Sequence, residues 1–409
     1  MGGIRSALFQ HWRQCAGFPA EVPYGHIPSP TLCSDSAFMK VLLNAPERVD
    51  PGGVAYYYRC ILPHLTADIE YFEVGVKRHD AGSLRNVRRL LRDYIDFFTK
   101  LRQKSYDIAH LNPSLNPKAI LRDALFLLIA KAFRKKVIVF VRGWDLAFEQ
   151  LIRQYFSFLF RFVYSKADAF IVLSSDFEAK LIEMGIDNLI FRETTVVADT
   201  VLARIDVKSL IAQRRARHGN FHILFLSRIE KSKGVYLALD TFRLLRERYP
   251  RITMTIAGDG GEAARARDYA ERNRIEAVEF VGYLDNDSKR IAFSRADMYF
   301  FPTFHGEGMP NSLLEAMAYG LPIVTRPVGG TRDFFEHGKM GFLTESLSCT
   351  VFADMIERLI LDSALRYDMG SRNHSFVVEN CMASTVATRL QAIYTTVLSS
   401  TIHSQSLER

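Results

Sequence analysis

Short apolar runs alternate with amphipathic helical patterns along most of the chain, and the alternation occurs twice. In the first half, the apolar runs stand at 39–44, 69–76, 107–111, 136–141, 169–173 and 189–197. In the second half, they stand at 222–228, 252–258, 278–283, 298–302 and 321–325. Apolar runs this short, bounded by turn residues, are typical of buried strands. Strands that alternate with helices predict an α/β fold whose parallel sheets are covered by helices on both faces.

The length of 409 residues exceeds what one hydrophobic core usually organises, and the pattern restarts near residue 200. We therefore expect two domains, at residues 39–200 and 201–383. Residues 1–38 hold four prolines and no sustained periodicity, which predicts an irregular N-terminal extension. The strand at 39–44, the pair Gly52-Gly53 and the helix after it form the opening of a Rossmann-like unit, where a phosphate approaches backbone without Cβ atoms.

The composition is that of a globular protein, with 48% hydrophobic and 24% charged residues. The five cysteines show no C-x-x-C spacing, so neither a zinc site nor a disulfide framework is expected. No apolar window reaches the length of a membrane-spanning helix, and the N-terminus lacks the pattern of a signal peptide. These features predict a cytoplasmic location. The formal charge of +8 comes without a nucleic-acid-binding motif, so nucleic acid is not an expected partner.

Basic residues are concentrated between Lys77 and Lys104, where nine of them face three acidic residues. Apolar residues lie between them at helical spacing, which predicts a basic amphipathic helix near 84–104. Two interpretations stay open: a solvated helix face on a sheet, or peripheral contact with an anionic membrane where a lipid-linked acceptor is held. The aromatic helix predicted at 149–164 is more typical of a core than of a membrane, because Arg153 and Arg161 interrupt it.

The stretch from His305 to Gly320 follows a buried strand and ends in a glycine suited to closing a helix. Asn311 or Ser312 is the expected N-cap, which leaves Glu315 in the first turn and Glu307 in the preceding loop. The free N–H groups at such a helix start attract anions, and a diphosphate suits them.

The two glutamates, with seven residues between them and Gly-Met-Pro-Asn at 308–311, resemble the E-x7-E signature of the retaining nucleotide-sugar glycosyltransferases of family 4. The resemblance implies a GT-B fold, in which two Rossmann-like domains face a central cleft. It further implies that residues 39–200 bind the acceptor, that 201–383 bind the nucleotide sugar, and that a helix within 384–409 crosses back to the N-terminal domain. In this family pattern, Glu307 contacts the sugar hydroxyls and Glu315 holds the ribose.

The same resemblance assigns further donor contacts. Arg228 and Lys233 match the pair that grips the diphosphate, where fixed cations stabilise the charge that builds up on the leaving group. Gly52 and Gly53 match the glycine loop that touches the phosphates from the other side of the cleft. Gly258 and Tyr283 end strands, where ligands of open parallel sheets bind, so we expect them beside the base. The remaining candidate substrate-binding residues follow Glu307 directly: Gly308, Met309, Asn311, Ser312 and Leu313.

The chain departs from the family after the strand at 137–141, where relatives commonly carry a histidine and this chain has Arg142. A guanidinium stays protonated and cannot act as a general base, but it could hold a phosphate or a carboxylated sugar. The alternative is an arginine paired with Asp145 or Glu149. His110, at the end of another predicted strand, is more typical of a hydrogen-bonded core histidine. Asp333 stands where the family usually has glutamate.

No metal or cofactor is expected besides the co-substrate, because Arg228, Lys233 and the helix start already offset the diphosphate charge. Asp285-Asn286-Asp287 superficially matches a metal-binding Asp-x-Asp motif, but it precedes a predicted helix and is better explained as an N-cap cluster. The expected activity is transfer of a sugar to a hydroxyl acceptor in the assembly of a surface polysaccharide or glycolipid. The alternatives are a nucleotide-sugar epimerase or hydrolase of the same fold, and a non-catalytic binding subunit.

Overall fold

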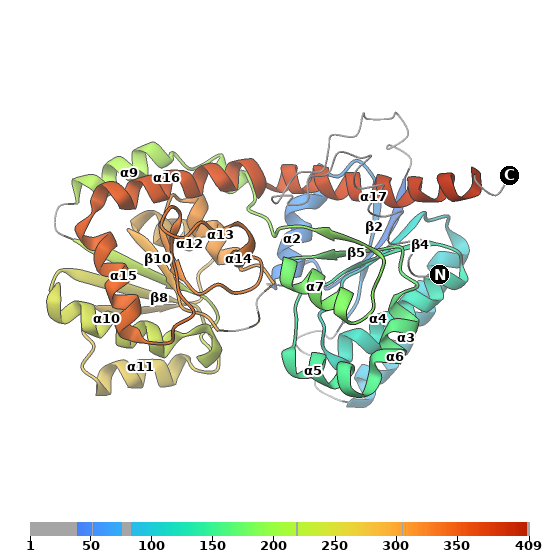
Figure 1. Ribbon diagram of the computed structural model, residues 1–409, viewed down its shortest axis with the longest axis horizontal. Coiled ribbons are helices and arrows are strands. Elements are labelled where there is room, and N and C mark those ends of the chain that lie inside the picture. The colour runs from blue at the N-terminus through green and yellow to red at the C-terminus, as the bar shows by residue number, and fades with distance from the viewer. Residues whose placement is uncertain are drawn as a thin grey trace.

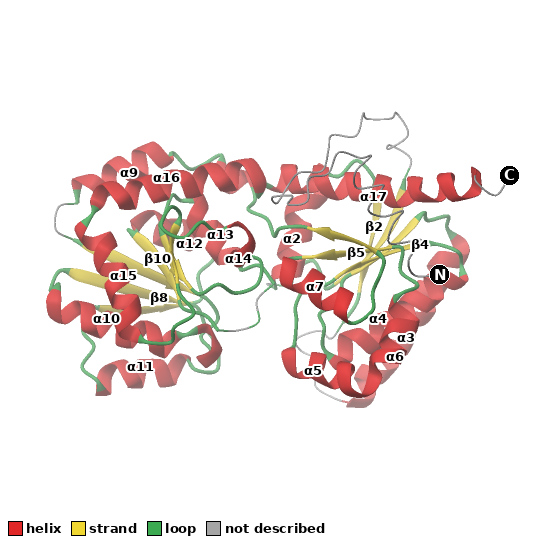
Figure 2. Cartoon of the chain, in the orientation of Figure 1, coloured by secondary structure: helices red, strands yellow, loops and turns green. Residues whose placement is uncertain are grey.

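The computed structural model describes residues 39–50, 52–75, 83–217, 220–304, 306 and 308–406. The extension predicted for residues 1–38 lies outside these ranges. The chain forms two α/β halves that lie next to each other, each with a central sheet covered by helices (Figures 1 and 2). Two parallel sheets in two Rossmann-like halves confirm the predicted fold class.

The N-terminal sheet has six parallel strands in the order β2-β1-β3-β4-β5-β6. The strands are β1 (Lys40–Ala45), β2 (Asp68–Glu73), β3 (Ile108–Leu111), β4 (Lys136–Phe140), β5 (Ala169–Val172) and β6 (Leu189–Arg192). One face is covered by α2 (Gly53–Ile61) and α17 (Ala383–Ser406), and the other by α3 (Ser83–Gln103), α4 (Pro117–Ala132), α6 (Ser157–Tyr164) and α7 (Ser175–Glu183). Because both faces are covered, the central strands are apolar at nearly every position.

The C-terminal sheet has the order β12-β11-β10-β7-β8-β9, again with parallel neighbours. Its strands are β7 (Phe221–Leu226), β8 (Ile252–Ala257), β9 (Val278–Gly282), β10 (Met298–Phe301), β11 (Ile323–Thr325) and β12 (Gly341–Leu343). Its helices are α9 (Val207–Ala216), α10 (Val235–Arg248), α11 (Ala263–Arg272), α12 (Asn286–Arg295), α13 (Asn311–Ala318), α14 (Thr331–Phe334), α15 (Cys349–Leu361) and α16 (Ser363–Asn380).

The strand order reverses between β7 and β10 in this sheet, and between β1 and β3 in the other. In open parallel sheets, ligands bind in the crevice outside the carboxyl ends of the strands at such a reversal. The loops that leave β1, β7 and β10 there carry Gly52-Gly53, Arg228 with Lys233, and the start of α13. The topology alone therefore brings the predicted donor loops to the inner edges of the two sheets.

The chain crosses between the halves at two adjacent segments. The backbone N–H of Val197 donates to Cys381, and that of Ala383 donates to Val197. Beyond this crossing, α17 runs along the N-terminal half and packs on α2 (Figure 1). Arg389 of α17 forms a buried ion pair with Glu193, with 2.6 Å between Nε and Oε1. The predicted domain boundaries after 200 and after 383 stay predictions, but the crossing lies beside both of them.

The aromatic helix predicted at 149–164 is wrong in two respects. It is divided into α5 (Leu146–Leu151), a π-helical segment η3 (Ile152–Phe156) and α6. It is also not a core helix throughout, because Phe158 is 81% exposed and Phe156 and Phe162 are about half exposed. Of these four phenylalanines, Phe160 alone faces the sheet, since the helical period turns the others outward. Among the described helices, none is both long and apolar enough to span a membrane.

Candidate active site between the two domains

The first turns of α2 and α13 face each other across the two halves. A Cβ atom on Gly53 of α2 would lie 3.2 Å from the side-chain nitrogen of Asn311, the first residue of α13. Each helix start carries N–H groups without intrahelical partners and the positive end of a helix dipole. Two such ends meeting at one point form a site for a doubly charged anion such as a diphosphate.

The start of α13 differs from the prediction that Asn311 or Ser312 caps it. The N-cap residue is Pro310, which has an extended backbone and no side chain able to accept from the helix. Asn311 is the first helical residue, and its Oδ1 is buried without a hydrogen-bond partner among the described residues. The Ser312 hydroxyl lies 2.7 Å from the Tyr299 hydroxyl and is occupied there. The first N–H groups of α13 are therefore not satisfied by a cap.

Glu307 and His305 lie outside the described residues, but their neighbours locate the loop. A Cβ on Gly308 would lie 2.7 Å from Leu173 Cδ1 and 3.1 Å from the Arg142 carbonyl oxygen, so this loop packs tightly against the ends of β4 and β5. The Gly308 carbonyl accepts from the Gly330 N–H. Met309 and Leu313 of the same stretch are buried in the core of the C-terminal half, so their side chains serve packing.

Glu315 is not in the first turn of α13, because the helix begins at Asn311 and places it in the second turn. Its side chain is almost fully buried and accepts two hydrogen bonds from Lys289 of α12, at 2.9 and 3.1 Å. The pair lines a cavity of about 270 Å³, to which Tyr56 of α2 and residues 198–204 also contribute. No sequence motif indicated Lys289, which precedes Glu315 by 26 residues.

Arg228 and Lys233 lie on the loop after β7 but in different surroundings. Lys233 is 5% exposed, whereas the Arg228 side chain is 66% exposed and pairs with Glu230 at 2.8 Å. Gly234 has a φ of +83°, and a Cβ there would lie 2.4 Å from the Pro302 carbonyl oxygen. This glycine lets the loop pack on the segment after β10. Lys233 is thus buried, while Arg228 of the same loop is exposed.

Gly258 and Tyr283 end β8 and β9 at the same edge of the sheet. A Cβ on Gly258 would lie 1.8 Å from the Ser227 carbonyl oxygen, so glycine is required for the strand ends to approach each other. The Gly258 N–H donates to the Gly282 carbonyl at 2.7 Å. The Tyr283 side chain is 71% exposed at this edge. Whether either contacts the base stays a prediction.

Arg142 is buried among aromatic rings. Its guanidinium carbon lies 3.6 Å from the ring centre of Phe140 and 4.0 Å from that of Tyr57. Its Nε donates to Asn112 at 3.1 Å, while Nη2 is buried without a partner in the described part of the chain. A donor in this state is available for an anionic group that enters beside it.

The alternative that pairs Arg142 with Asp145 or Glu149 is wrong. Asp145 caps α5 by accepting from two of its N–H groups, and Glu149 accepts from Trp144 and Arg153. Both carboxylates are already engaged by partners closer in the chain.

His110 is the core histidine that its position predicted. It is fully buried, and its ring nitrogens lie 2.7 Å from the Tyr394 hydroxyl and 3.3 Å from the Tyr58 hydroxyl. Burial, and then the charge of Arg142, lower the pKa of His110 well below 6.5. A neutral imidazole held in this way is part of the packing between the sheet and α17.

Asp333 of α14 makes a contact between the halves that sequence reasoning did not predict. Its carboxylate accepts from the backbone N–H of Ser175 at 2.6 Å and from the Ser175 hydroxyl at 2.5 Å. Ser175 begins α7, so the carboxylate lies at a positive helix end. This contact ties the glycine pair at 329–330 to the N-terminal half.

Asp285 is the N-cap of α12 and accepts from the Ser288 N–H at 2.8 Å, as the N-cap interpretation predicted. Hydrogen bonds from Ser288 lower the pKa of Asp285. Within the described ranges, no three histidine, cysteine or carboxylate side chains gather in a way that could hold a metal ion.

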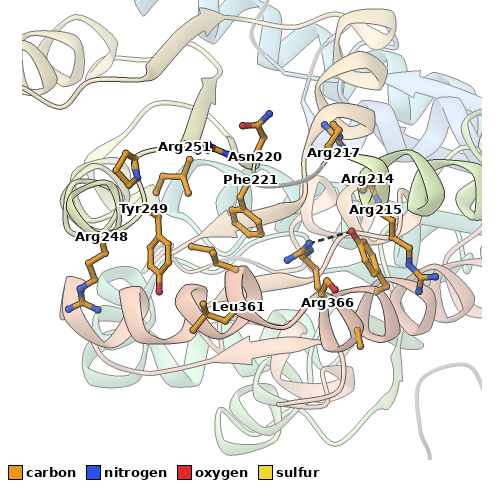
Figure 3. A pocket seen from close by; sticks show the side chains of 16 residues that line it. Arg214, Arg215, Arg217, Asn220, Phe221, Arg248, Tyr249, Arg251, Leu361 and Arg366 are labelled. Atoms are coloured by element: carbon orange, nitrogen blue, oxygen red, sulfur yellow. Dashed lines mark hydrogen bonds between the residues drawn. The ribbon is translucent and has the colours of Figure 1, made fainter.

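A larger cavity, of about 850 Å³, lies elsewhere. Six arginines line it, together with Phe221 and Ile252, the first residues of β7 and β8 (Figure 3). It therefore opens at the amino ends of the strands. Lys233 and the start of α13 lie at the opposite, carboxyl ends. We do not assign it to the donor.

Two family models match the chain. The model described as "Glycosyl transferase 4-like domain" matches residues 44–191, and that described as "Glycosyl transferases group 1" matches residues 206–376. Glycogen synthase from Mycobacterium tuberculosis is 28% identical over 56% of this chain and 54% of its own length. The capsular polysaccharide biosynthesis glycosyltransferase CapM from Staphylococcus aureus is 27% identical over 44% of this chain and 47% of its own. The chain thus spans about half the length of these curated relatives.

Solved structures share the fold over most of the chain. Anabaena Alr3699/HepE, in complex with UDP and glucose, has a TM-score of 0.65 at 19% identity and covers 87% of this chain and 99% of its own. Sucrose-phosphate synthase from Thermosynechococcus elongatus has a TM-score of 0.69 at 16% identity, covering 88% of this chain and 100% of its own. With both sheets, the crossing helix and both matching models in place, the chain belongs to the family 4 glycosyltransferases of the GT-B fold.

Proposed function

We propose that this chain transfers a sugar from a nucleotide diphosphate sugar to a hydroxyl acceptor, with retention of the anomeric configuration. The observation that carries the proposal is the meeting of two helix starts, at Gly53 and Asn311, with Lys233 buried on the loop after β7, at the carboxyl edge of the C-terminal sheet. Relatives named for glycogen, capsular polysaccharide and inositol glycosides support this class of reaction.

In the proposed reaction, the two helix starts and Lys233 hold the diphosphate. The negative charge on the leaving nucleoside diphosphate grows as the glycosidic bond breaks, and cations held in a dry crevice stabilise it without reorganisation. Arg228, now paired with Glu230 at the rim, would swing onto the outer phosphate. Glu307 would bond the sugar hydroxyls and favour the positive charge at the anomeric carbon.

Glu315 would hold the ribose hydroxyls. A carboxylate has about four acceptor positions, and Lys289 uses one on each oxygen, so two remain for the sugar. Lys289 would therefore hold Glu315 in its orientation. Tyr56 closes this cavity from the N-terminal half, so nucleotide binding here would draw the halves together.

Retention is supported by the groups at the end of the N-terminal strands. An inverting transfer needs a positioned base that takes the acceptor proton. In the described part of this edge, His110 is buried and hydrogen-bonded on both nitrogens, and Arg142 stays protonated. We propose that the departing phosphate accepts the proton instead. Arg142, through its unpartnered Nη2, would contact an anionic group of donor or acceptor.

We further propose that the reaction needs no added metal ion, because the buried lysine and the helix starts offset the diphosphate charge. Purified enzyme should keep its turnover in excess chelator. Activity lost in chelator and restored by manganese would contradict this.

We propose a lipid-linked acceptor of a surface polysaccharide or glycolipid. Such an acceptor requires peripheral contact between the enzyme and a membrane, for which the basic helix α3 is the candidate from sequence.

The experiment has two steps. A thermal-shift screen over UDP-, GDP-, ADP- and TDP-linked sugars identifies the donor, and NMR of the product reads the anomeric configuration. Glu307→Ala should then lower kcat by at least about 10³-fold while the melting temperature stays unchanged, as expected when a charge-stabilising group is removed. Glu271→Ala, an exposed glutamate of α11, is the matched control. Retained turnover in Glu307→Ala would refute the assignment.

The same assay separates the alternatives. Products formed from the donor alone, without acceptor, would identify an epimerase or hydrolase. A donor that shifts the melting temperature but is never turned over with any acceptor would identify a binding subunit.

A further inference from the structure

The outer helices of the N-terminal half leave an unusual number of large apolar side chains uncovered. On α3, the residues Val87, Leu91, Ile95 and Phe98 are 45–65% exposed. On α4, Leu121 is 70% exposed, and Leu125 and Leu128 are more than a third exposed. On the helix formed by η3 and α6, the exposed residues are Tyr155, Phe156, Phe158, Leu159 and Phe162. Apolar groups that gather in this way mark an interaction site.

Each set forms a stripe along its helix. Val87, Leu91, Ile95 and Phe98 recur every three or four residues, so they lie within one side of α3. Leu121, Leu125 and Leu128 do the same on α4. The sides of both helices that face the sheet are buried: Phe97 and Leu101 of α3, and Phe126 and Leu127 of α4, belong to the core beneath. Helices α3 and α4 therefore each carry two sets of apolar residues, one buried in the core and one exposed on the surface.

The three stripes belong to one surface. Helix α3 packs against α4, and α4 packs against α6, and the three lie side by side in Figure 1. Their inner sides share one hydrophobic core on the same face of the sheet. Their outward sides therefore form one layer, which we call the three-helix face: the outward sides of α3, α4 and residues 152–164.

The three-helix face is also strongly basic. Lys100, Lys131 and Arg153 of these helices pair with Glu70, Asp168 and Glu149 outside them. Counted over all their sides, residues 83–103, 117–132 and 152–164 hold eleven basic and three acidic residues, a net charge of +8. This equals the formal charge of the whole chain, so the remaining residues are neutral in sum. Exposed cations border the apolar stripes, among them Arg88 and Arg92 on α3 and Arg161 on α6. The Lys166 ammonium lies 4.4 Å from the centre of the exposed Phe162 ring.

We propose that the three-helix face lies in the interfacial plane of an anionic membrane, with its apolar stripes among the acyl chains and its basic residues on the headgroups. Helices with an apolar side and a lysine- and arginine-rich border bind membranes in this orientation. A second copy of the chain is a poor occupant, because the exposed cations of two such faces, among them Arg88, Arg92 and Arg161, would repel each other. The excess of one charge sign selects a surface of the opposite sign.

The face is placed to present the cleft to the membrane. Helices α4 and α5 begin directly after β3 and β4, at the carboxyl edge of the sheet where Arg142 lies. The starts of both helices, with the exposed Leu121 in the second turn of α4 and Leu146 as the first residue of α5, therefore lie near this edge. An acceptor anchored in the same membrane would enter beside them. This last step rests on the proposed transferase function, whereas the membrane contact itself does not.

The test is co-sedimentation of the full chain with vesicles of phosphatidylcholine alone or mixed with phosphatidylglycerol. The wild type should bind the mixed vesicles, and added salt should weaken binding as it screens the charges. Phe158→Ser/Phe162→Ser should bind at least about a hundredfold more weakly, since inserting each ring is worth about tenfold or more. Arg88→Gln/Arg92→Gln should bind roughly thirtyfold more weakly, at about fivefold for each charge near an anionic surface.

Leu347→Ser/Leu361→Ser is the matched control, because these residues are 58% and 70% exposed on the C-terminal half. It should bind like the wild type. All variants should keep the wild-type melting temperature and turnover with a lipid-free acceptor, so loss of binding is separable from failure of the proposed transfer. Two results would overturn the proposal. In one, the wild type binds neutral and anionic vesicles equally well. In the other, the variants of the three-helix face bind anionic vesicles as well as the control does. A dimer that dissociates in Phe158→Ser/Phe162→Ser would also overturn it.

Discussion

Substitution of Gly258 by alanine tests the geometry that brings the donor loops together. Gly258 has a φ of +131°, and its added Cβ would lie 1.8 Å from the Ser227 carbonyl oxygen. Contacts of Cβ atoms below 3.0 Å essentially never occur, so the ends of β7 and β8 would have to separate by about 1.2 Å, the difference between 3.0 and 1.8 Å. That movement would shift the loop that carries Arg228 and Lys233.

The magnitude follows from two contributions. A non-glycine residue in this backbone region costs about 1–3 kcal/mol. Overpacking against a rigid backbone costs about 1–3 kcal/mol more. We therefore expect Gly258→Ala to lower the free energy of unfolding by about 2–6 kcal/mol, the sum of the two. For a domain of this size, each kcal/mol lowers the melting temperature by about 2–4 °C.

Two further glycines serve as controls for the separate contributions. Gly282 has a φ of +71° and nothing within 4 Å of its added Cβ, so Gly282→Ala should cost only about 1–2 kcal/mol of backbone strain. Gly261 has neither a positive φ nor a close neighbour, so Gly261→Ala should be neutral or stabilise by up to about 1 kcal/mol. Thermal unfolding of the three variants in one buffer ranks their stabilities, and we expect Gly258→Ala to be the least stable and Gly261→Ala the most stable.

The result that would refute the reasoning is a Gly258→Ala variant no less stable than Gly282→Ala. The strand ends would then not approach as closely as the structure shows. A stable Gly258→Ala with unchanged donor affinity would also show that the position of the Arg228 loop does not depend on this approach.

Three other perturbations test separate parts of the structure. Arg389→Met removes the cation that pairs with buried Glu193, and should lower the free energy of unfolding in urea by about 3–5 kcal/mol. Arg389→Met/Glu193→Gln should recover most of this loss, because no unpaired charge stays buried. Equal stability of the two variants would contradict this. Burial alone would raise the pKa of Glu70, but hydrogen bonds from Lys100 and two neighbours lower it to about 2. This carboxylate therefore stabilises the fold above about pH 4.5, and the stabilisation is lost as the pH falls toward 2. Lys100→Met should make the free energy of unfolding in urea depend less on pH in this range. An unchanged pH dependence would show that the Lys100–Glu70 hydrogen bond does not contribute to it. Asp333→Ala removes the contact with α7. It should leave the melting temperature near its wild-type value and raise the donor KM roughly tenfold, as expected for two lost hydrogen bonds. A fall in melting temperature without a change in KM would show that Asp333 stabilises the fold and does not affect donor binding.

Local patterns predicted the elements well and their ends less well. Buried parallel strands are apolar along their whole length, so strands such as β4 and β7 stand out from the sequence. The start of α13 was predicted wrongly because Asn and Ser are both good caps in general. Here Pro310 takes the cap position, and Tyr299 engages the Ser312 hydroxyl.

Site residues were predictable where they stand in a motif and not where they depend on a distant partner. Glu315 was proposed from its spacing, and its contact with the ribose stays a prediction. Its partner Lys289 was not predictable, since nothing near it in the chain distinguishes it from other lysines. Arg142 was recognised as a departure from the family pattern, but its surroundings were not predictable. They combine Tyr57 of α2, Asn112 after β3 and Phe140 of β4, which are far apart in the chain.

The sequence by itself determined the two parallel sheets, their order along the chain and the loops that carry the donor motifs, because these depend on periodicity and on residues close to one another. Only the tertiary structure decided which apolar residues remain uncovered. Phe158 and Phe160 are alike in sequence, but one faces solvent and the other the sheet. Burial depends on which elements stack against which, and no element of the described chain covers α3, α4 and α6 from outside.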